Sequence, residues 1–155
     1  MWNDREFSRR YDELMHRLQK AEHPSKNLFD DVISIYPRVI SLIRAGRAKR
    51  LQELMQAGAW LETALELLRL ARSAWSLRRL IRDDEDWVCS LSRSTFVPIE
   101  IDDMAEYRHA DPAVAVLGAL LQVDDAPFGH AGAVKPDRRG HAAQPGQMLY
   151  VDALD

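Results

Sequence analysis

The chain has 155 residues, 46% hydrophobic and 29% charged, which is typical of one globular domain with its own core. Cys89 is its single cysteine, which excludes an intrachain disulfide and favours a cytoplasmic location. The charged first ten residues predict that no secretory signal is present, and no apolar run is long enough to span a membrane.

The net charge of −3 is unevenly distributed along the chain. Residues 1–60 hold 11 Lys and Arg against 8 Asp and Glu, whereas residues 94–155 hold 4 against 10. This balance does not by itself indicate a nucleic-acid-binding protein, but it permits one if the basic residues share a face.

Three or four short helices are predicted in the first sixty residues. Apolar residues spaced by three and four predict a helix over about residues 3–22. Ser25 is a predicted N-cap of the second helix, and Pro37 is the predicted first residue of the third. A fourth short helix is predicted between Gly46 and Gly58, and each glycine is expected to follow a helix end in a left-handed conformation.

The next segment is a longer helix, about residues 60–72, with apolar residues around most of its circumference, which we predict to be the central element of the core. The period then changes to two, which predicts strands at about 75–82 and 87–92 around an acidic turn. A third strand is predicted at 96–101, restricted to a sheet edge by Pro98.

The pairing of the first two strands is predicted from their apolar residues. Pairing Ile81 with Val88 would place the two apolar sets on opposite faces of the sheet, because neighbouring residues alternate between faces. An odd-length loop or a bulge at the turn would instead pair Ile81 with Trp87 and Leu77 with Leu91. We therefore predict an odd loop or a bulge at the turn, with Arg79 on the inward face.

The last part of the predicted domain contains two further helices. Asp103 and Glu106 have the spacing of a capping box at the start of a short helix. Asp111 precedes Pro112, which predicts a helix through Leu121 that covers the same sheet face as the helix over 60–72.

These elements predict an α+β fold, with a helical N-terminal half packed with a small two- or three-stranded antiparallel sheet. We expect residues 1–123 to form a single domain, in which 1–58 are helical and 59–123 follow an α-β-β-(β)-α order. Residues 124–155 are rich in Gly and Pro and poor in large apolar groups, which predicts a flexible tail.

Part of the sequence resembles a known group of proteins. The residues concerned are Trp75-Ser76-Leu77-Arg78-Arg79-Leu80, then Trp87 to Arg93, then Pro98 and Ile101-Asp102-Asp103. They resemble short alphaproteobacterial proteins of unknown function over roughly residues 60–122, which implies a bacterial origin. The element order also resembles small α-β-β-α sandwich domains of phage genomes. Neither resemblance implies an activity.

A metal site is one candidate. Asp102, Glu106 and His109 would share a face of the predicted helix, and two carboxylates with an imidazole are ligands for a divalent metal. Alternatively, an aspartate caps this helix while the other two side chains contact water. Cys89 is predicted to be a buried small hydrophobic residue rather than a nucleophile, so we predict no catalytic residue and no cofactor.

Two groups of basic residues are candidates for binding phosphate. They are Arg44, Arg47, Lys49 and Arg50 around Gly46, and Arg78 and Arg82 on the first predicted strand. Alternatively, these cations lie at helix ends or on a solvated face of the sheet. A further set would contact a protein partner if exposed, namely Trp2, Trp75, Met148, Leu149 and Tyr150.

The sequence thus favours a non-enzymatic protein-interaction or regulatory module, with another protein as partner and a homo-oligomer as an open alternative. The first alternative is a nucleic-acid-associated accessory protein that uses the arginine clusters. The second is a small metal-dependent enzyme.

Overall fold

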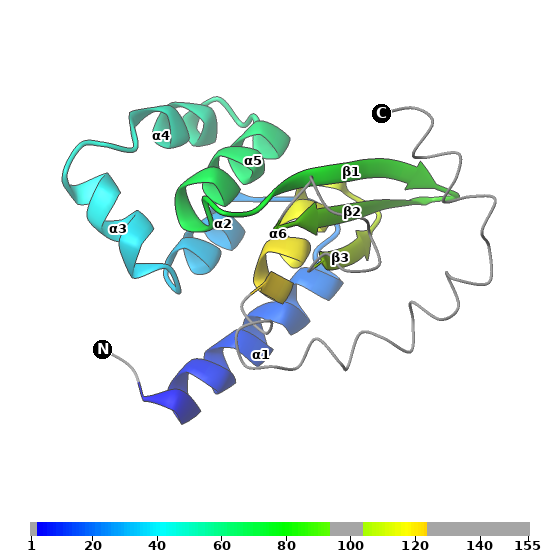
Figure 1. The fold of residues 1–155 in the computed structure, drawn as a ribbon, viewed down its shortest axis with the longest axis horizontal. Coiled ribbons are helices and arrows are strands. Elements are labelled where there is room, and N and C mark those ends of the chain that lie inside the picture. Colours follow the sequence, from blue (N-terminus) through cyan, green and yellow to red (C-terminus); the bar gives the residue numbers. More distant parts are fainter. Residues whose placement is uncertain (1–2, 94–103, 124–155) are drawn as a thin grey trace. The chain divides into compact units, whose positions relative to one another are not determined.

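The computed structural model describes residues 3–93 and 104–123 (Figure 1). The chain divides into two units, Met1–Val123 and Asp124–Asp155, and all described residues belong to the first. The predicted strand at 96–101 and the predicted tail lie outside the described residues. The described part contains six helices and a three-stranded antiparallel sheet, which confirms the α+β fold class.

The helices follow one another through the first half of the unit and return at its end. They are α1 (Asp4–Lys20), α2 (Lys26–Ile33), α3 (Pro37–Arg44), α4 (Lys49–Gln56), α5 (Trp60–Ala71) and α6 (Pro112–Val123). Among the helices of the described residues, none has both the length and the apolar character needed to cross a membrane.

Local capping chemistry sets the helix ends where the sequence predicts them. The Ser25 hydroxyl accepts a hydrogen bond from the Leu28 amide at 3.2 Å, and the Asp111 carboxylate accepts one from the amide two residues later at 2.8 Å. Gly46 and Gly58 follow α3 and α4 with φ of +72° and +71°. These predictions are confirmed, because a left-handed residue after a helix is least costly for glycine.

The sheet has the order β1-β2-β3, formed by β1 (Ser76–Asp83), β2 (Asp86–Ser92) and β3 (Met104–His109). The prediction that a helix begins at Asp103 and includes Glu106 is therefore wrong, because β3 occupies this segment. Ala105 and Tyr107 pair with Leu91 and Cys89 of β2, and this non-local pairing overrides the local helical spacing.

The predicted hairpin turn is also wrong. Ile81 pairs with Val88 and Asp83 with Asp86, so the loop has two residues, Asp84 and Glu85. Asp84 has φ of +57°, a left-handed conformation that aspartate tolerates better than most residues. The turn therefore adds no extra residue, so the apolar residues Leu77 of β1 and Leu91 of β2 are aligned by another feature.

A β-bulge at Arg78 aligns the start of β1 with the end of β2. Leu77 pairs with Leu91 as predicted, but the next paired residue of β1 is Arg79, opposite Ser90, so Arg78 is the extra residue. The bulge therefore lies at the start of β1 rather than at the turn. Since directly paired residues share a face, Arg79 lies on the face opposite Leu77, and the prediction that it faces inward is wrong.

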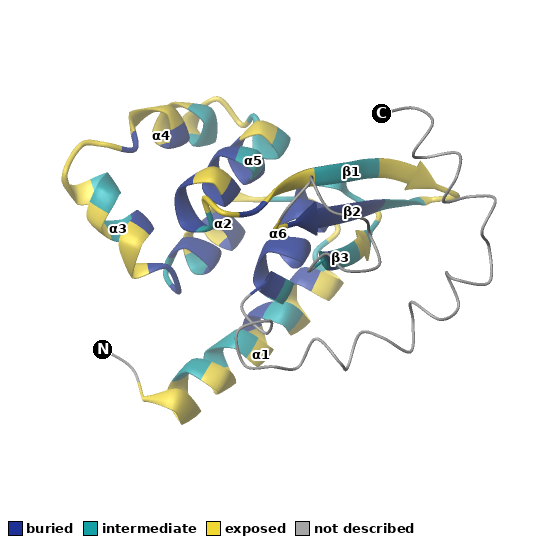
Figure 2. Cartoon of the chain, viewed as in Figure 1, coloured by how far each residue is buried: buried dark blue, intermediate teal, exposed yellow. Residues whose placement is uncertain are grey.

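Helix α6 is the central helix of the core, and not α5 as predicted. It contacts β2, β3, α5 and α1, and nearly all of its residues are buried (Figure 2). It packs closely against the sheet at Gly118, where an added Cβ would lie 2.1 Å from the Tyr107 ring. Helix α5 contacts α6 on one side and α3 and α4 on the other, so it connects the helical half to the sheet layer.

Candidate interaction surfaces

The structure does not bring the predicted metal ligands together. Asp102 lies outside the described residues. Glu106 and His109 are three residues apart on β3, so their side chains lie on opposite faces of the sheet. Glu106 accepts a hydrogen bond from the Ser90 hydroxyl at 2.8 Å, and His109 Nδ1 accepts one from the Asp111 amide at 2.9 Å. Across residues 3–93 and 104–123, no three His, Cys, Asp or Glu side chains are placed to share a metal ion.

Cys89 is fully buried in β2, on the face that α6 covers. Burial raises the pKa of its thiol to about 12, and the negative charge of Glu106 adds to this shift. A thiol with such a pKa stays protonated at neutral pH, so it is a poor nucleophile and a poor metal ligand. Its position agrees with the interpretation of Cys89 as a small core residue.

Strand β1 forms one edge of the sheet, and none of the other described strands pairs with its outer side. Leu77 and Ile81 of this strand are each 37% exposed. Among the residues that the structure describes, they are the large hydrophobic side chains that are exposed to solvent. Leu77 lies on the α6 side of the sheet and Ile81 on the other side, because the bulge separates them. The β1 edge therefore presents an apolar side chain on each face.

The charges along β1 are mainly positive. Arg78, Arg79 and Arg82 lie on this strand, with Asp83 at its end. Asp83 is paired, because Arg108 Nη2 of β3 donates to its carboxylate at 2.9 Å, and Arg108 Nε lies 3.3 Å from Asp86. Bonding to Asp83 raises the pKa of the Arg108 guanidinium. Strand β1 itself is therefore net positive, with three arginines against one aspartate, although the turn that follows it is acidic.

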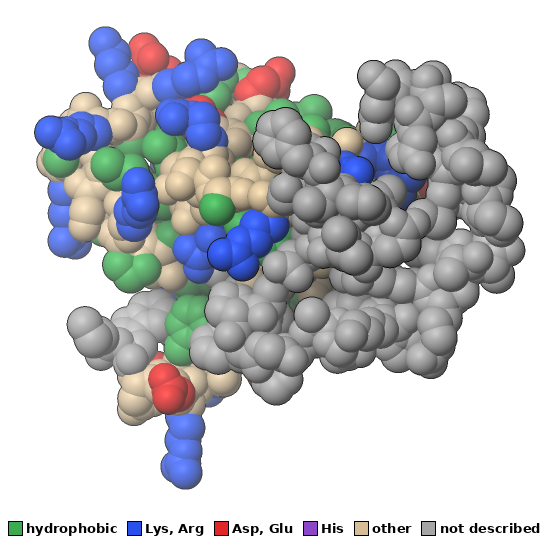
Figure 3. Space-filling view, viewed as in Figure 1, with side chains coloured by type: hydrophobic (Ala, Val, Ile, Leu, Met, Phe, Trp, Pro, Cys, Tyr) green, Lys and Arg blue, Asp and Glu red, His purple; other side chains and the backbone are tan. Residues whose placement is uncertain are grey.

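A second cationic surface covers α3, α4 and the turn between them. We define the α3–α4 basic surface as Arg38, Arg44, Arg47, Lys49 and Arg50, all of which are exposed. Figure 3 shows Lys and Arg side chains gathered over the part of the molecule that α3 and α4 occupy in Figure 1. The N-terminus of α4 is not capped by a side chain, so the positive pole of that helix faces the same region.

The two predicted groups of arginines belong to different surfaces. Arg44 to Arg50 lie around the α3–α4 turn, whereas Arg78 and Arg82 lie on β1, and α5 contacts both α4 and β1 between them. Arg82 donates a weak hydrogen bond to the Asp84 carbonyl at 3.4 Å. Sequence reasoning did not include Arg38, which is part of the same acid-free segment and has the same exposure.

The predicted partner-binding residues have different outcomes. Trp75 is only 9% exposed, so the exposure on which its candidate role as an anchor depends is not met. Trp2, Met148, Leu149 and Tyr150 lie outside the described residues. The structure adds Leu77 and Ile81, whose alternation with polar neighbours is also typical of the inward-facing residues of a half-buried strand. No pattern in the sequence marks which of two edge strands stays uncovered.

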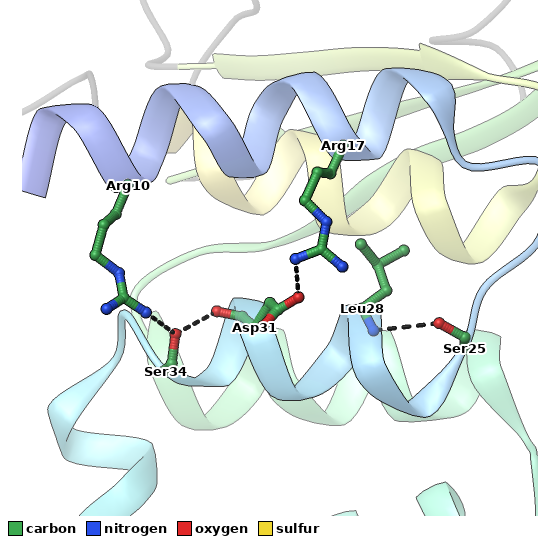
Figure 4. A network of polar contacts seen from close by, with 6 residues as sticks. All are labelled: Arg10, Arg17, Ser25, Leu28, Asp31 and Ser34. Carbon is green, nitrogen blue, oxygen red and sulfur yellow. Dashed lines mark hydrogen bonds and ion pairs between the residues drawn. The ribbon is translucent and has the colours of Figure 1, made fainter.

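A shallow groove of about 190 Å³ lies between α1 and α2. Arg17 of α1 forms an ion pair with Asp31 of α2, and Arg10 Nη2 donates to the Ser34 hydroxyl at 3.4 Å (Figure 4). Ser34 in turn donates to the Asp31 carbonyl at 2.6 Å. The groove is smaller than the roughly 300–1,000 Å³ of usual ligand pockets. Four of its polar side chains or their backbone groups already bond to one another, namely Arg10, Arg17, Asp31 and Ser34. We therefore interpret these contacts as a link between α1 and α2.

No family model, no curated protein and no solved structure matches this chain. The resemblance to alphaproteobacterial and phage proteins therefore stays a prediction, and a function has to be argued from the two exposed surfaces.

Proposed function

We propose that this protein is a non-enzymatic binding module that takes up an extended, acidic segment of another protein along the outer edge of β1. The observation that carries this proposal is the position of Leu77 and Ile81, the exposed large hydrophobic residues, on a strand whose outer side has no partner among the described strands. An unpaired edge offers backbone N–H and C=O groups to an added strand.

The β1 edge is better suited to such pairing than the β3 edge. Residues Ser76, Leu77 and 81–83 of β1 are exposed, whereas most of β3 is buried or half-buried. The regular part of β1 after the bulge runs from Arg79 to Asp83, which corresponds to an added strand of about four to six residues. Ile81 and Leu77 would then contact alternate side chains of that segment on opposite faces.

The charge of β1 favours an acidic segment over a second copy of this chain. Each β1 strand carries three arginines and one aspartate, so pairing two copies edge to edge would double this positive charge along one seam. Like charges on adjacent strands are unfavourable, and opposite charges are favourable. An acidic partner with alternating small or β-branched residues meets both the backbone and the charge requirements.

The test is the binding of labelled ten-residue peptides to the full chain. An acidic peptide of alternating Glu and Val should bind, while the same peptide with every second amide N-methylated should bind at least tenfold more weakly, because it loses backbone pairing. Binding should also slow hydrogen exchange of β1 amides. Equal binding of both peptides, unchanged β1 exchange or absence of binding would each refute strand addition.

A double variant adds a matched comparison. Leu77→Ser with Ile81→Ser removes the two exposed apolar groups and should weaken peptide binding about tenfold, with little change in folding because both sites are exposed. Leu61→Ser with Leu54→Ser, at half-buried positions on the helical half, is the control and should leave peptide affinity unchanged.

A further inference from the structure

The α3–α4 basic surface holds a concentration of charge that the proposed strand-binding function does not use. The segment 32–52 contains five Lys and Arg and no Asp or Glu, although the whole chain has 21 basic and 24 acidic residues. All five cations are exposed. A local positive field on a net acidic protein attracts a polyanion to this one surface.

Four of these five cations have no carboxylate partner in residues 3–93 and 104–123. Arg38, Arg44, Arg47 and Lys49 form no ion pair or hydrogen bond through their side chains there. Arg50 Nε lies 4.0 Å from Glu66. That carboxylate already accepts two hydrogen bonds from Arg69, at 3.0 and 2.6 Å, which leaves the Arg50 charge largely uncompensated.

The chain path keeps four of the five cations close together. Arg44 ends α3, Arg47 lies in the turn, and Lys49 and Arg50 begin α4. Gly46 reverses the chain between the helices with φ of +72°. Six residue steps cover at most about 20 Å even when extended, so the four charges fit within the length of a few successive phosphates of one nucleic-acid strand.

The surroundings of this surface distinguish between classes of partner. The large apolar side chains of α3 and α4 are buried or half-buried, so the surface has no exposed apolar anchor. Protein interfaces generally depend on a few buried aromatic or apolar anchors, and interfacial helices insert an apolar face into the membrane. Contact with a phosphate backbone requires only cations and polar groups.

We propose that the α3–α4 basic surface binds the phosphate backbone of a nucleic acid, without reading its base sequence. This inference goes beyond the strand-binding function and does not depend on it, because the two surfaces lie on different elements. Four phosphate contacts to a duplex give a slope of about −3.6 for the logarithm of affinity against that of salt concentration, so affinity should fall about 100-fold between 50 and 200 mM salt.

The experiment is a fluorescence-anisotropy salt titration of the full chain with a labelled 20-base-pair DNA duplex. The test variant is Arg44→Gln, Arg47→Gln and Lys49→Gln combined. The control is Arg5→Gln, Arg9→Gln and Lys20→Gln combined, which changes the net charge equally at exposed positions of α1. The test variant should bind at least tenfold more weakly at 50 mM salt and lose about three units of slope, while the control stays near the parent protein.

Several outcomes would overturn the proposal. Equal weakening by both variants would show that net charge alone drives binding, and a salt-independent affinity would exclude phosphate contacts. Tighter binding to phosphatidylserine vesicles or to polyglutamate than to the duplex would assign the surface to a membrane or an acidic protein. Affinity that differs strongly between duplexes of unrelated sequence would contradict backbone-only binding.

Discussion

The outer edge of β1 and the α3–α4 basic surface both expose arginines, but different side chains surround those arginines. On β1, Leu77 and Ile81 are exposed next to the arginines, and no other described strand pairs with the outer side of this edge strand. On α3 and α4 most backbone N–H and C=O groups bond within the helices, and the large apolar side chains are buried or half-buried. We therefore propose a polypeptide partner for the arginines of β1 and a phosphate backbone for those of α3 and α4.

Both surfaces depend on a stable fold, and Gly118→Ala, at the close contact between α6 and the sheet, should destabilise that fold most. The added methyl group would lie 2.1 Å from the Tyr107 ring, so helix and sheet would have to separate. We expect the free energy of unfolding to fall by about 3 kcal/mol, as for overpacking of a tight core. Urea denaturation measures this loss, and Gly118→Ala combined with Tyr107→Leu should recover part of it. A loss below about 1 kcal/mol would mean that the contact relaxes easily.

Leu51→Ala should destabilise α4, the helix that carries part of the α3–α4 basic surface. Leu51 is fully buried and is the one buried residue of α4, so its truncation removes the main apolar contact of that helix. We expect a loss of about 2–3 kcal/mol and faster hydrogen exchange in α4 than in β2. Ile81→Ala, at an exposed site, should cost less than about 1 kcal/mol. Uniform acceleration of exchange across the chain would contradict the local character of the effect.

Exchanging charges sharpens the distinction between the two surfaces. Arg79→Gln with Arg82→Gln should weaken binding of the acidic peptide about five- to tenfold and reduce its salt dependence, because two partner charges are lost. The same variant should bind the DNA duplex as the parent does. Arg44→Gln with Arg47→Gln is the reciprocal control for the peptide. If either pair weakened both ligands equally, the two surfaces would not be separate.

The smallest expected effect concerns Cys89. Its pKa rises from an ordinary 9.0 to about 12 in the folded protein, so above pH 9 the unfolded chain releases this proton while the folded chain retains it. Stability should therefore decline as the pH rises above 9, by under about 1 kcal/mol at pH 9.5. Cys89→Ala should remove this part of the decline; the rest includes Tyr107, whose pKa is also raised by burial. Rapid alkylation of native Cys89 at pH 8 would contradict its burial.

The helical half could be predicted from the sequence because its signals are local. Ser25 and Gly46 act on their own helix ends, so the helices of this half begin and end as expected, and Asp111 does the same for α6. The sheet was predicted less well because strand pairing is decided by distant residues. The segment Met104–His109 has helical spacing, yet its alternation of Ala105, Tyr107 and His109 with polar neighbours also fits a strand, and pairing with β2 determines the outcome.

The two candidate surfaces were only partly predictable for the same reason. Arg44, Arg47, Lys49 and Arg50 are close in sequence, so their proximity follows from the chain itself. Leu77 and Ile81 became candidates only once the register was known, because the bulge at Arg78 assigns them to opposite faces. The metal hypothesis depended on a helix that does not form, since Met104–His109 is a strand. Neither Glu106 nor His109 alone indicates that the segment is a strand.

The bulge at Arg78 also bears on how the gene encoding this chain tolerates changes in length. Deleting this one codon would leave Leu77 opposite Leu91 and Arg79 opposite Ser90, as consecutive pairs of an uninterrupted ladder, so the hairpin would still form. Deleting a residue between Arg79 and Asp83 would instead send the preceding side chains to the wrong face. The shortened hairpin would have a flatter edge strand. Bulges in edge strands are one means by which proteins avoid edge-to-edge aggregation. We therefore expect deletion of Arg78 to lower solubility more than it lowers the stability of the hairpin.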